Sequence, residues 1–542
     1  MTDWVDEFLS QPTPSADAPA PRDGAFGSYD AADRHQKFVN WAPAVRHADG
    51  DLLPVKKILD DRSIDMARND GLVAGGVTLH KDHIVGARFM LAAKPATRLV
   101  RGGDDEVWER EFQEEVETLF SLWADSPPCW PDAGGRNTLT DLTRLAVGSM
   151  SSTGEILAVS EWLSDYGRPM QTATMILDPA RLKSPADKLG NSELRAGVER
   201  DRRGAPIAYH ILDRRPGDFS SGYGFAESRR VMARKPSGRI QVFHAFEQLR
   251  PDQSRGVAAM VTALSEMRMW KQFSHIELER AAMAAMYATT LETDAPPDVV
   301  YQLLGAEAKN PLITATADHL DIMTNYMDGS KNLHVNGVKV PALPLGTSLK
   351  IQGTQTESPV GSELEASFLR RIAASFGLTY EQFSRDLSRT NYSSIRAGLG
   401  ESLLHMQALK RRSGARFATY VYQLWFEEAV ARGLLTTVTQ SVDELRHGML
   451  FEALTACDWI GSALAQVDPL KETQAAMLRI RGGLSSYEIE SRVLGTDWAS
   501  NAKQRAREHE TFKKLGIVSA YDTEPTDAEN AATGEPREET VE

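Results

Sequence analysis

Cysteine is scarce in this chain: only Cys129 and Cys457 occur among 542 residues. They lie far apart in the sequence, and neither belongs to a CxxC pair or to a cluster with histidine. A disulfide framework and a structural zinc site both need several cysteines at close, regular spacing. The sequence therefore supports neither of them, and so few thiols fit a reducing compartment.

Long apolar runs are also missing. No window approaches the roughly 18 uncharged apolar residues of a membrane helix, and the opening residues MTDWVDEFLS are acidic rather than basic followed by apolar. The sequence predicts a soluble chain with neither a membrane span nor a secretory signal. Because 42% of the residues are hydrophobic, the chain can bury a large core, and its length favours roughly two to four domains.

Catalytic motifs are absent as well. There is no GxxxxGK[ST] loop, no GxGxxG, no HExxH pair and no Ser/His/Asp elbow. His80 and His83 stand three residues apart, but no further ligand follows at a fixed spacing, so they do not indicate a metal site. The acidic runs Asp60-Asp61 and 104–106 are typical of solvated surfaces. We expect no catalytic residue, no metal and no cofactor, although a site assembled in space would leave no such motif.

Charge is unbalanced toward acid, with a formal net charge of −14. This argues against a protein that grips nucleic acid over its whole surface by neutralising phosphates. It does not argue against a protein that DNA merely passes through. Seven of the net negative charges lie in residues 521–542, where eight carboxylates face only Arg537, and that composition predicts a disordered tail.

The first half of the chain predicts an α+β domain. Residues 1 to about 50 are rich in Pro, Ala, Ser, Asp and Gly, which indicates a flexible arm. The pattern of residues 63–91 suggests a helix, a break at Gly86 and a strand. Another helix follows, with an apolar face of Val107, Phe112, Val116, Leu119, Phe120 and Trp123. Four strands are then predicted at Glu155–Trp162, Thr172–Leu177, Pro206–Leu212 and Arg239–Phe246.

The second half predicts long helices around a compact insert. One helix can run from Arg255 to about Leu291, with an alanine-rich end that suits close packing of many copies or, equally, the core of a monomer. The insert 294–353 contains Asn336-Gly337 between short apolar runs, which is typical of a two-residue hairpin turn. Phe451–Leu454 and 458–461 predict a returning strand. After Asp468-Pro469 two helical stretches follow, with Ser485 and Glu488 as a capping box.

The whole chain is arranged around residues 361–428. A first amphipathic helix carries Leu364, Phe368, Leu369, Ile372 and Phe376 and is expected to end at Gly377. A second helix of roughly forty residues follows the polar run 384–394, with one apolar side and one basic side. The run between them is rich in hydrogen-bond donors. It suits transient contact with phosphates, or a solvated connection between two helices.

Two stretches of this region carry a family resemblance. FLRRIAASFGLTYEQFSRDLSRTNYSSIRAG and PDQSRGVAAMVTALSEMRMWKQFSHIELERAAMAAMYATTLE resemble the stem and tunnel-loop segments of lambda-type portal proteins of tailed phages. The resemblance extends from about Ser63 to Glu510. It implies an α+β portal fold that forms a ring oligomer, with the following parts: arm 1–50, wing 51–253, stem helix 254–292, clip 293–355, second stem helix 356–383, tunnel loop 384–394, long helix and return to the wing 395–466, helical crown 467–515 and acidic tail 516–542.

The resemblance implies a non-enzymatic protein of the virion. Such a ring, usually of twelve copies, sits at one capsid vertex, after assembly in the host cytoplasm, and conducts double-stranded DNA during packaging and ejection. The implied partners are the terminase large subunit, which would hydrolyse ATP, a head-tail adaptor, and the major capsid and scaffolding proteins. The alternatives from other classes are a nucleic-acid-processing enzyme with a spatially assembled metal site, and a monomeric nucleic-acid-binding protein.

The resemblance also implies three sets of functional residues. The tunnel loop would contact DNA through Arg385, Arg389, Thr390, Asn391, Tyr392, Ser393 and Ser394. The clip would dock the motor through the hairpin Leu333, His334, Val335, Asn336, Gly337, Val338, Lys339 and Val340. Packing of the stem into a ring would involve Glu277, Arg280, Ala281, Ala284, Ala285 and Ala288.

Overall fold

The computed structural model describes residues 46–165, 167–188, 191–214, 228–286, 333–335, 338–340, 363–388, 392–463 and 468–519. Almost all of the predicted arm and acidic tail, and the predicted helices of the insert, lie outside these residues. Where the arm was expected to continue to residue 50, helix α2 (Ala48–Asn69) has already begun.

The N-terminal part contains more helix than the sequence pattern indicated. The stretch before Gly86 forms two helices, α2 and α3 (Gly71–Ile84). Asp70 separates them because its carboxylate accepts hydrogen bonds from the first backbone N–H groups of α3. Strand β1 (Met90–Ala93), α4 (Thr97–Arg101), α5 (Glu106–Ala124) and α6 (Leu139–Thr153) follow in order.

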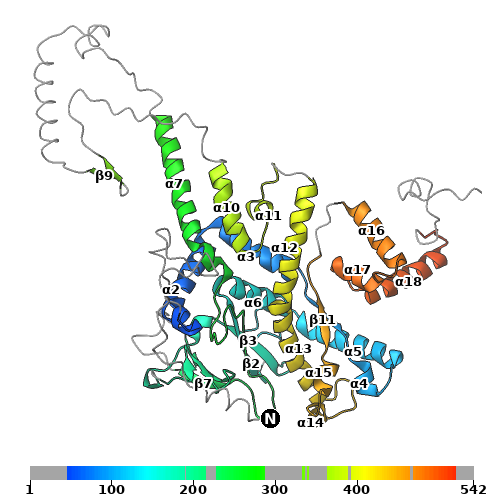
Figure 1. The fold of residues 1–542 in the computed structure, drawn as a ribbon. Helices are drawn as coiled ribbons and strands as arrows, with labels where there is room; N and C mark the ends of the chain where they lie inside the picture. Colours follow the sequence, from blue (N-terminus) through cyan, green and yellow to red (C-terminus); the bar gives the residue numbers. More distant parts are fainter. Residues whose placement is uncertain are drawn as a thin grey trace, which may run out of the picture.

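The described residues form four small antiparallel sheets, of which the two largest make up the central β part (Figure 1). In the first, β2 (Glu155–Trp162) lies between β3 (Thr172–Leu177) and β8 (Val242–Phe246), and Leu157 pairs with Leu177 on one side and His244 on the other. The second has the order β4 (Leu194–Arg195), β5 (Val198–Arg200), β6 (Pro206–Leu212) and β7 (Ser228–Met232). The predictions of β2, β3 and β6 are confirmed, whereas β8 begins three residues later than expected.

The core is built around α13 (Gly414–Ala431). The predicted forty-residue helix is divided at Ser413, whose φ of −113° and ψ of −85° separate α13 from α12 (Tyr392–Arg412). The predicted apolar side of α13 is buried, but burial extends around most of the helix, and only a strip that includes Arg416, Thr419 and Gln423 stays at least partly exposed. The buried residues cover the rest of its circumference. They include Phe417, Tyr420, Val421, Tyr422, Leu424, Trp425 and Phe426.

Three helices stand together on one side of the sheets (Figure 1). They are α7 (Leu264–Met286), α10 (Glu363–Ser375) and the first half of α12. The first was expected to begin at Arg255. It begins at Leu264 instead, after an extended segment and the 3-10 turn η4 (Ala259–Ala263).

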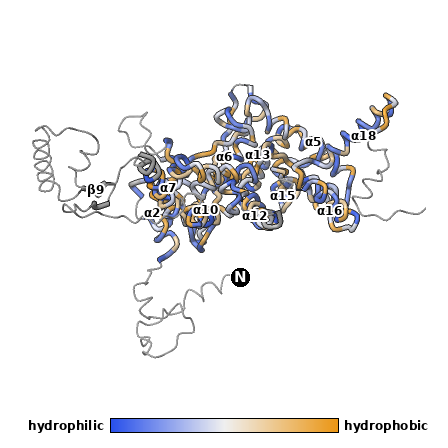
Figure 2. The backbone as a smooth tube through the Cα atoms, turned by 90° about the horizontal axis from the view of Figure 1, so that it is seen from above, coloured by the Kyte–Doolittle hydropathy of each residue, from blue (hydrophilic) through white to orange (hydrophobic). Residues whose placement is uncertain are grey.

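The C-terminal part returns to the core and then leaves it. The segment after α14 (Val442–Leu445) forms helix α15 (Leu450–Leu454), where a strand was predicted, before β11 (Cys457–Ile460) pairs antiparallel with β1. Helices α16 (Pro469–Arg481), α17 (Tyr487–Val493) and α18 (Trp498–Leu515) lie at the end of the molecule opposite α7 (Figure 2). Helix α17 is capped by Ser486 rather than by the expected pair of Ser485 and Glu488.

Candidate functional site

The polar loop begins from a well-defined turn. Helix α10 is followed by Gly377, whose φ of +65° is the left-handed conformation expected of a helix-ending glycine. Thr379 and Gln382 then form a reciprocal capping box at the start of the short helix α11 (Tyr380–Ser384), which was not predicted. Arg385, with φ of +58°, ends α11, and its backbone N–H donates to the carbonyl of Glu381 at 2.8 Å.

This turn is fastened to α3. The rings of Phe376 and Phe383 stack with centroids 5.6 Å apart, and both are buried. They lie over Gly76, where an added Cβ would stand only 3.0 Å from one ring and 3.2 Å from the other. The absence of a side chain at Gly76 therefore lets α10 and α11 approach the backbone of α3.

His80, one turn further along α3, completes the attachment. Its Nε2 lies 2.8 Å from the carbonyl oxygen of Phe376, and its Nδ1 lies 2.8 Å from the hydroxyl of Ser151 on α6. Burial lowers the pKa of His80 to about 4, so the ring is neutral and holds three helices together. His80 and His83 join no metal cluster: within the described ranges no group of three or more His, Cys, Asp or Glu side chains could hold an ion.

The described part of the loop is organised by its own side chains. The hydroxyl of Ser384 accepts from the N–H of Asp386, and the carboxylate of Asp386 accepts from the N–H of Ser388. Such bonds replace helical hydrogen bonds in a tight turn. Of the predicted contact residues, Arg385 lies at the start of the loop, Arg389, Thr390 and Asn391 lie outside the described residues, and Tyr392, Ser393 and Ser394 form the first turn of α12 rather than loop.

Helices α7 and α10 lie against each other, with Arg371 Nη1 3.9 Å from a carboxylate oxygen of Glu266. On α7, Arg280 donates to Glu277 at 2.9 Å; the arginine is exposed as expected of a solvated face, but the Glu277 side chain is only 11% exposed. Ala281, Ala284 and Ala285 belong to the helix, and Ala288 lies outside the described residues.

Helix α7 has a second feature, exposed apolar side chains, which its small residues did not indicate. The side chains of Met269, Ile276 and Leu278 are 54%, 59% and 69% exposed in the single chain. The sequence signal for this feature was the occurrence of apolar residues between charged residues along the predicted helix. Met269 and Ile276, seven residues apart, share one side of the helix, and Leu278 lies on another side. Both sides of this projecting helix therefore carry apolar groups that other protein surfaces can cover.

The predicted hairpin of the insert is confirmed as an antiparallel pair. Strand β9 (Leu333–Val335) pairs with β10 (Val338–Val340), and Val335 faces Val338 next to the two-residue turn. The turn residues Asn336 and Gly337 lie outside the described residues, as do the side-chain surroundings of His334 and Lys339.

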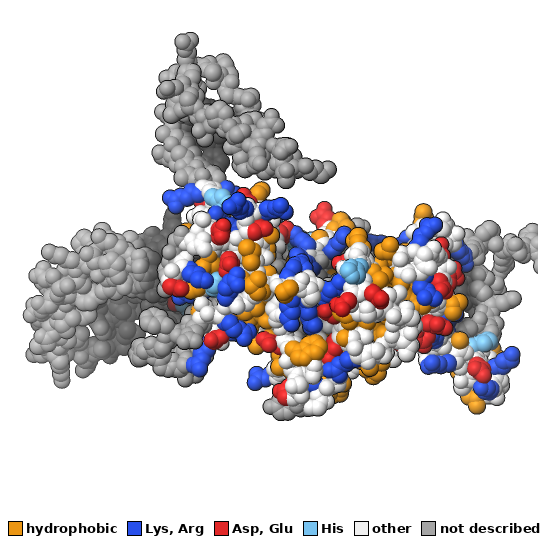
Figure 3. Space-filling view, turned by 90° about the horizontal axis from the view of Figure 1, so that it is seen from below, with side chains coloured by type: hydrophobic (Ala, Val, Ile, Leu, Met, Phe, Trp, Pro, Cys, Tyr) orange, Lys and Arg blue, Asp and Glu red, His pale blue; other side chains and the backbone are white. Residues whose placement is uncertain are grey.

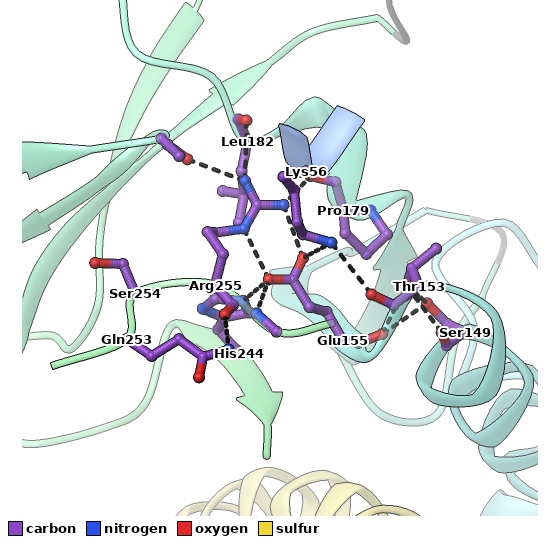
Figure 4. Close-up of polar contacts among 12 residues, drawn as sticks. Lys56, Ser149, Thr153, Glu155, Pro179, Leu182, His244, Gln253, Ser254 and Arg255 are labelled. Atoms are coloured by element: carbon purple, nitrogen blue, oxygen red, sulfur yellow. Dashed lines mark hydrogen bonds and ion pairs between the residues drawn. The ribbon is translucent and has the colours of Figure 1, made fainter. Parts of the chain in front are cut away.

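A buried ionic cluster fixes the chain just before α7 (Figure 4). Arg255 donates through Nε and Nη2 to the two carboxylate oxygens of Glu155 at 2.8 and 2.7 Å, and also to the carbonyls of Pro179 and Ala196. Glu155 is fully buried at the start of β2. Burial alone would raise the pKa of Glu155, but the charges of Arg255 and Lys56 hold this pKa well below its usual range.

The same cluster reaches α2. Lys56 Nζ donates to both oxygens of Asp60 at 2.7 Å and to the carbonyl of Thr153 at 3.2 Å. Asp60, expected on a solvated face, is only 9% exposed, and burial raises its pKa to about 6. The sequence could not show this because Glu155 and Arg255, the other charged groups of the cluster, come much later in the chain, in and just after the β part.

The outer surface is mixed in charge. Figure 3 shows acidic and basic side chains interspersed over the described part of one face. No described helix combines the length and the apolar character needed to cross a membrane.

Comparison with known proteins identifies the family. The profile of the phage portal proteins of the lambda family matches residues 34–410, which include α7, α10 and α11. The portal protein of Escherichia phage N15 is 32% identical over 481 residues, covering 88% of each chain. Portal protein B of Escherichia phage lambda is 30% identical over 479 residues with the same coverage of both chains.

Among solved structures, the neck of a native gene transfer agent particle, computed with C12 symmetry, aligns with a TM-score of 0.35 and 12% identity over 80% of this chain and 93% of that chain. That likeness is too weak to add to the assignment. The family profile covers more than half of the sequence, and both relatives align with most of it at 30% identity or more. The chain therefore belongs to the lambda family of phage portal proteins and is a portal protein of a tailed phage.

Proposed function

We propose that copies of this protein assemble into a ring at one vertex of the virion and that double-stranded DNA passes through its centre. The main support is the joint projection of α7, α10 and the start of α12 from one side of the sheets, with apolar side chains of α7 left uncovered (Figure 1). Identical neighbours placed around a closed rotation axis would cover such a surface.

The net charge suits a conduit. A chain with formal charge −14 attracts phosphates weakly, so DNA would not adhere over the whole channel. We assign the contact with DNA to the loop that begins at Arg385, because Phe376, Phe383 and His80 hold the residues just before this loop in place. A loop anchored in this way can press against the DNA backbone without shifting its base.

The partners follow from this role. We assign the terminase large subunit to the β9–β10 hairpin, and a head-tail adaptor to the same end of the ring after packaging. Major capsid and scaffolding proteins would surround the ring at the vertex, and assembly would take place in the host cytoplasm. A structural role without catalysis is the corresponding proposal for the chain itself.

The loop is tested by replacing Arg385 and Arg389 with alanine. Removing two cations per subunit weakens transient phosphate contacts in every copy of the loop. We expect fewer filled heads, counted by electron microscopy, with rings of normal size. Arg62→Ala/Arg110→Ala, which removes the same charge from exposed positions on α2 and α5, is the control. A normal yield of filled heads from the loop variant would contradict the assignment.

The hairpin is tested by deleting Leu333 to Val340 and joining the ends with two glycines. Loss of both strands removes the proposed docking surface while α7 and α10 stay intact. We expect the terminase large subunit to be lost from a pull-down with assembled rings. Terminase binding at the level of the parent ring would reject this docking site.

A metal-dependent nuclease remains the alternative from another class. It gains no support from the described residues, which hold no cluster of metal-ligating side chains. Cleavage of DNA by purified protein only when a divalent ion is added would favour it over the structural role.

A further inference from the structure

A large groove runs along one side of α12 and α13. Its volume is about 1280 Å³, and its walls come from β6 and β8 on one side and from β11 and α17 on the other. It continues past Met406 into a second hollow of about 460 Å³ between α12, α16 and α17. The proposed passage of DNA makes no use of either hollow.

The charge of this groove is one-sided. Among the described residues that line it, Asp458 is the single carboxylate, and Arg492 already pairs with it at 2.8 Å. Four further cations line the groove without an ion pair to any described carboxylate. They are Arg234, Lys410, Arg411 and Arg416.

Lys410 is the least solvated of these cations. Its Nζ lies 5.5 Å from the ring centroid of Phe89, and burial lowers its pKa. Arg416 in turn lies over the ring of Phe243, 5.9 Å from its centroid. An anion that approaches a half-buried ammonium beside guanidinium groups without carboxylate partners stabilises the charged form of the ammonium. The groove is therefore suited to an acidic occupant.

The chain carries one segment of matching charge. Residues 521–542 contain eight carboxylates and a single arginine. The described chain reaches Ser519 just beyond α18, which contacts α17 at the rim of the groove. The 23 residues from 520 onward could span about 75 Å when extended, whereas α18 is only about 27 Å long. The tail can therefore fold back to the groove.

The dimensions favour a single extended chain over a double helix. If an extended peptide has the cross-section of a strand in a packed sheet, the volume of the larger hollow accommodates roughly eight of its residues. Lys410 lies among Phe89, Gly461 and the groove walls, where a rigid duplex could not reach it. A peptide backbone can follow the groove and place alternate carboxylates against its cations.

We propose that the acidic C-terminal segment, residues 520–542, docks in the groove formed by α12, α13, β8 and α17 through carboxylate pairs with Lys410, Arg411 and Arg416. This docking is independent of the proposed passage of DNA.

Zero-length carbodiimide coupling of the full chain tests the proposal directly. It joins lysine amines to carboxylates in contact, so we expect amide links from Lys410 to glutamates or aspartates of 520–542, identified by mass spectrometry. Lys410→Arg keeps the charge but cannot form the link, and it should abolish these products. Links from Lys410 to carboxylates elsewhere in a second copy, without links to the tail, would overturn the proposal.

Charge reversal provides the matched comparison. Arg411→Glu/Arg416→Glu should lower the yield of the Lys410 links at least five-fold, whereas Arg62→Glu/Arg110→Glu changes the net charge equally and should not. Circular dichroism checks that both variants are folded. Equal yields from the two variants would also overturn the proposal.

Native cysteines give a second readout. Cys457 lines the groove and Cys129 does not. Changing all eight tail carboxylates to amides should speed alkylation of Cys457 several-fold and leave Cys129 unchanged. An unaltered alkylation rate at Cys457 would count against docking. So would slowing of Cys457 alkylation by duplex DNA added to the amide variant, if it equals the slowing caused by the native tail.

Discussion

At the scale of single residues, the important groups are buried polar side chains with distant partners. Asp60 belongs to an acidic run that was expected on a solvated surface, and His80 was noted only as an unsuitable metal ligand, yet both side chains are buried. Periodicity does not predict this burial, because groups from other elements surround both side chains. Phe376 and Ser151 bond His80, and Glu155 and Arg255 lie near Asp60, which is bonded by Lys56 of its own helix. Residue types predict their usual environment, and tertiary contacts decide the actual one.

His80 predicts a pH dependence of stability. Its pKa is about 4 in the folded chain and near its ordinary value of 6.5 when unfolded. Above pH 6.5 both states are neutral and the stabilisation is complete. As the pH falls from 6.5 to 4 only the unfolded state takes up the proton, so about 3 kcal/mol is lost.

Urea denaturation of the parent chain and of His80→Gln at several pH values measures this loss. The amide of glutamine can still bond to neighbouring polar groups but does not titrate. We expect the stability advantage of the parent to shrink by about 3 kcal/mol between about pH 7 and pH 4. Asp60 and Glu117, whose pKa values burial raises, contribute to both proteins and cancel in the difference. A constant difference across this range would contradict a neutral, buried His80.

At the scale of elements, the sequence predicted regular segments well and their junctions poorly. Strands β2, β3 and β6 have the predicted bounds because alternation and flanking glycines define them locally. The interruption at Ser413 and the short helix α11 depend on packing against other elements, which periodicity does not contain. The loop was correctly placed between two helices, but its attachment to α3 came only from the structure.

Neighbouring glycines of α3 test that attachment. An added Cβ at Gly75 meets nothing within 4 Å, so Gly75→Ala should stabilise the helix by about 0.5–1 kcal/mol. At Gly76 the same methyl would press on Phe383 and Phe376, and overpacking should cost about 1–3 kcal/mol. Chemical denaturation measures both changes. Equal stability of the two alanine variants would contradict the close contact of Gly76 with Phe376 and Phe383.

At the scale of the whole molecule, family resemblance carried more information than composition. The lack of long apolar runs argued against a membrane span and the acidic charge argued against a general nucleic-acid binder, but neither observation could indicate a ring. The resemblance to portal proteins, confirmed by the family match, did so. The groove along α12 and α13 was not predicted, because its walls come from four separate parts of the chain.

Assembly is the prediction at this scale. Light scattering of purified protein under assembly conditions should give a mass of roughly several hundred kilodaltons rather than the 59.8 kDa of one chain. Ile276→Glu/Leu278→Glu on α7 should shift the protein toward the single-chain mass, since charges would replace apolar contacts. The exposed pair Leu434→Glu/Met449→Glu, far from α7, is the control. A chain that stays at 59.8 kDa in all conditions would contradict the ring.

The clamp of Arg255 on Glu155 has a mechanical consequence for α7. Because the guanidinium is bonded to β2 and to the carbonyls of Pro179 and Ala196, the segment that leads through η4 into α7 is fixed to the sheets. A pull or twist applied at the far tip of α7 would then be transmitted as torque to the β framework instead of being absorbed by a swivelling joint. The helix is built as a lever arm.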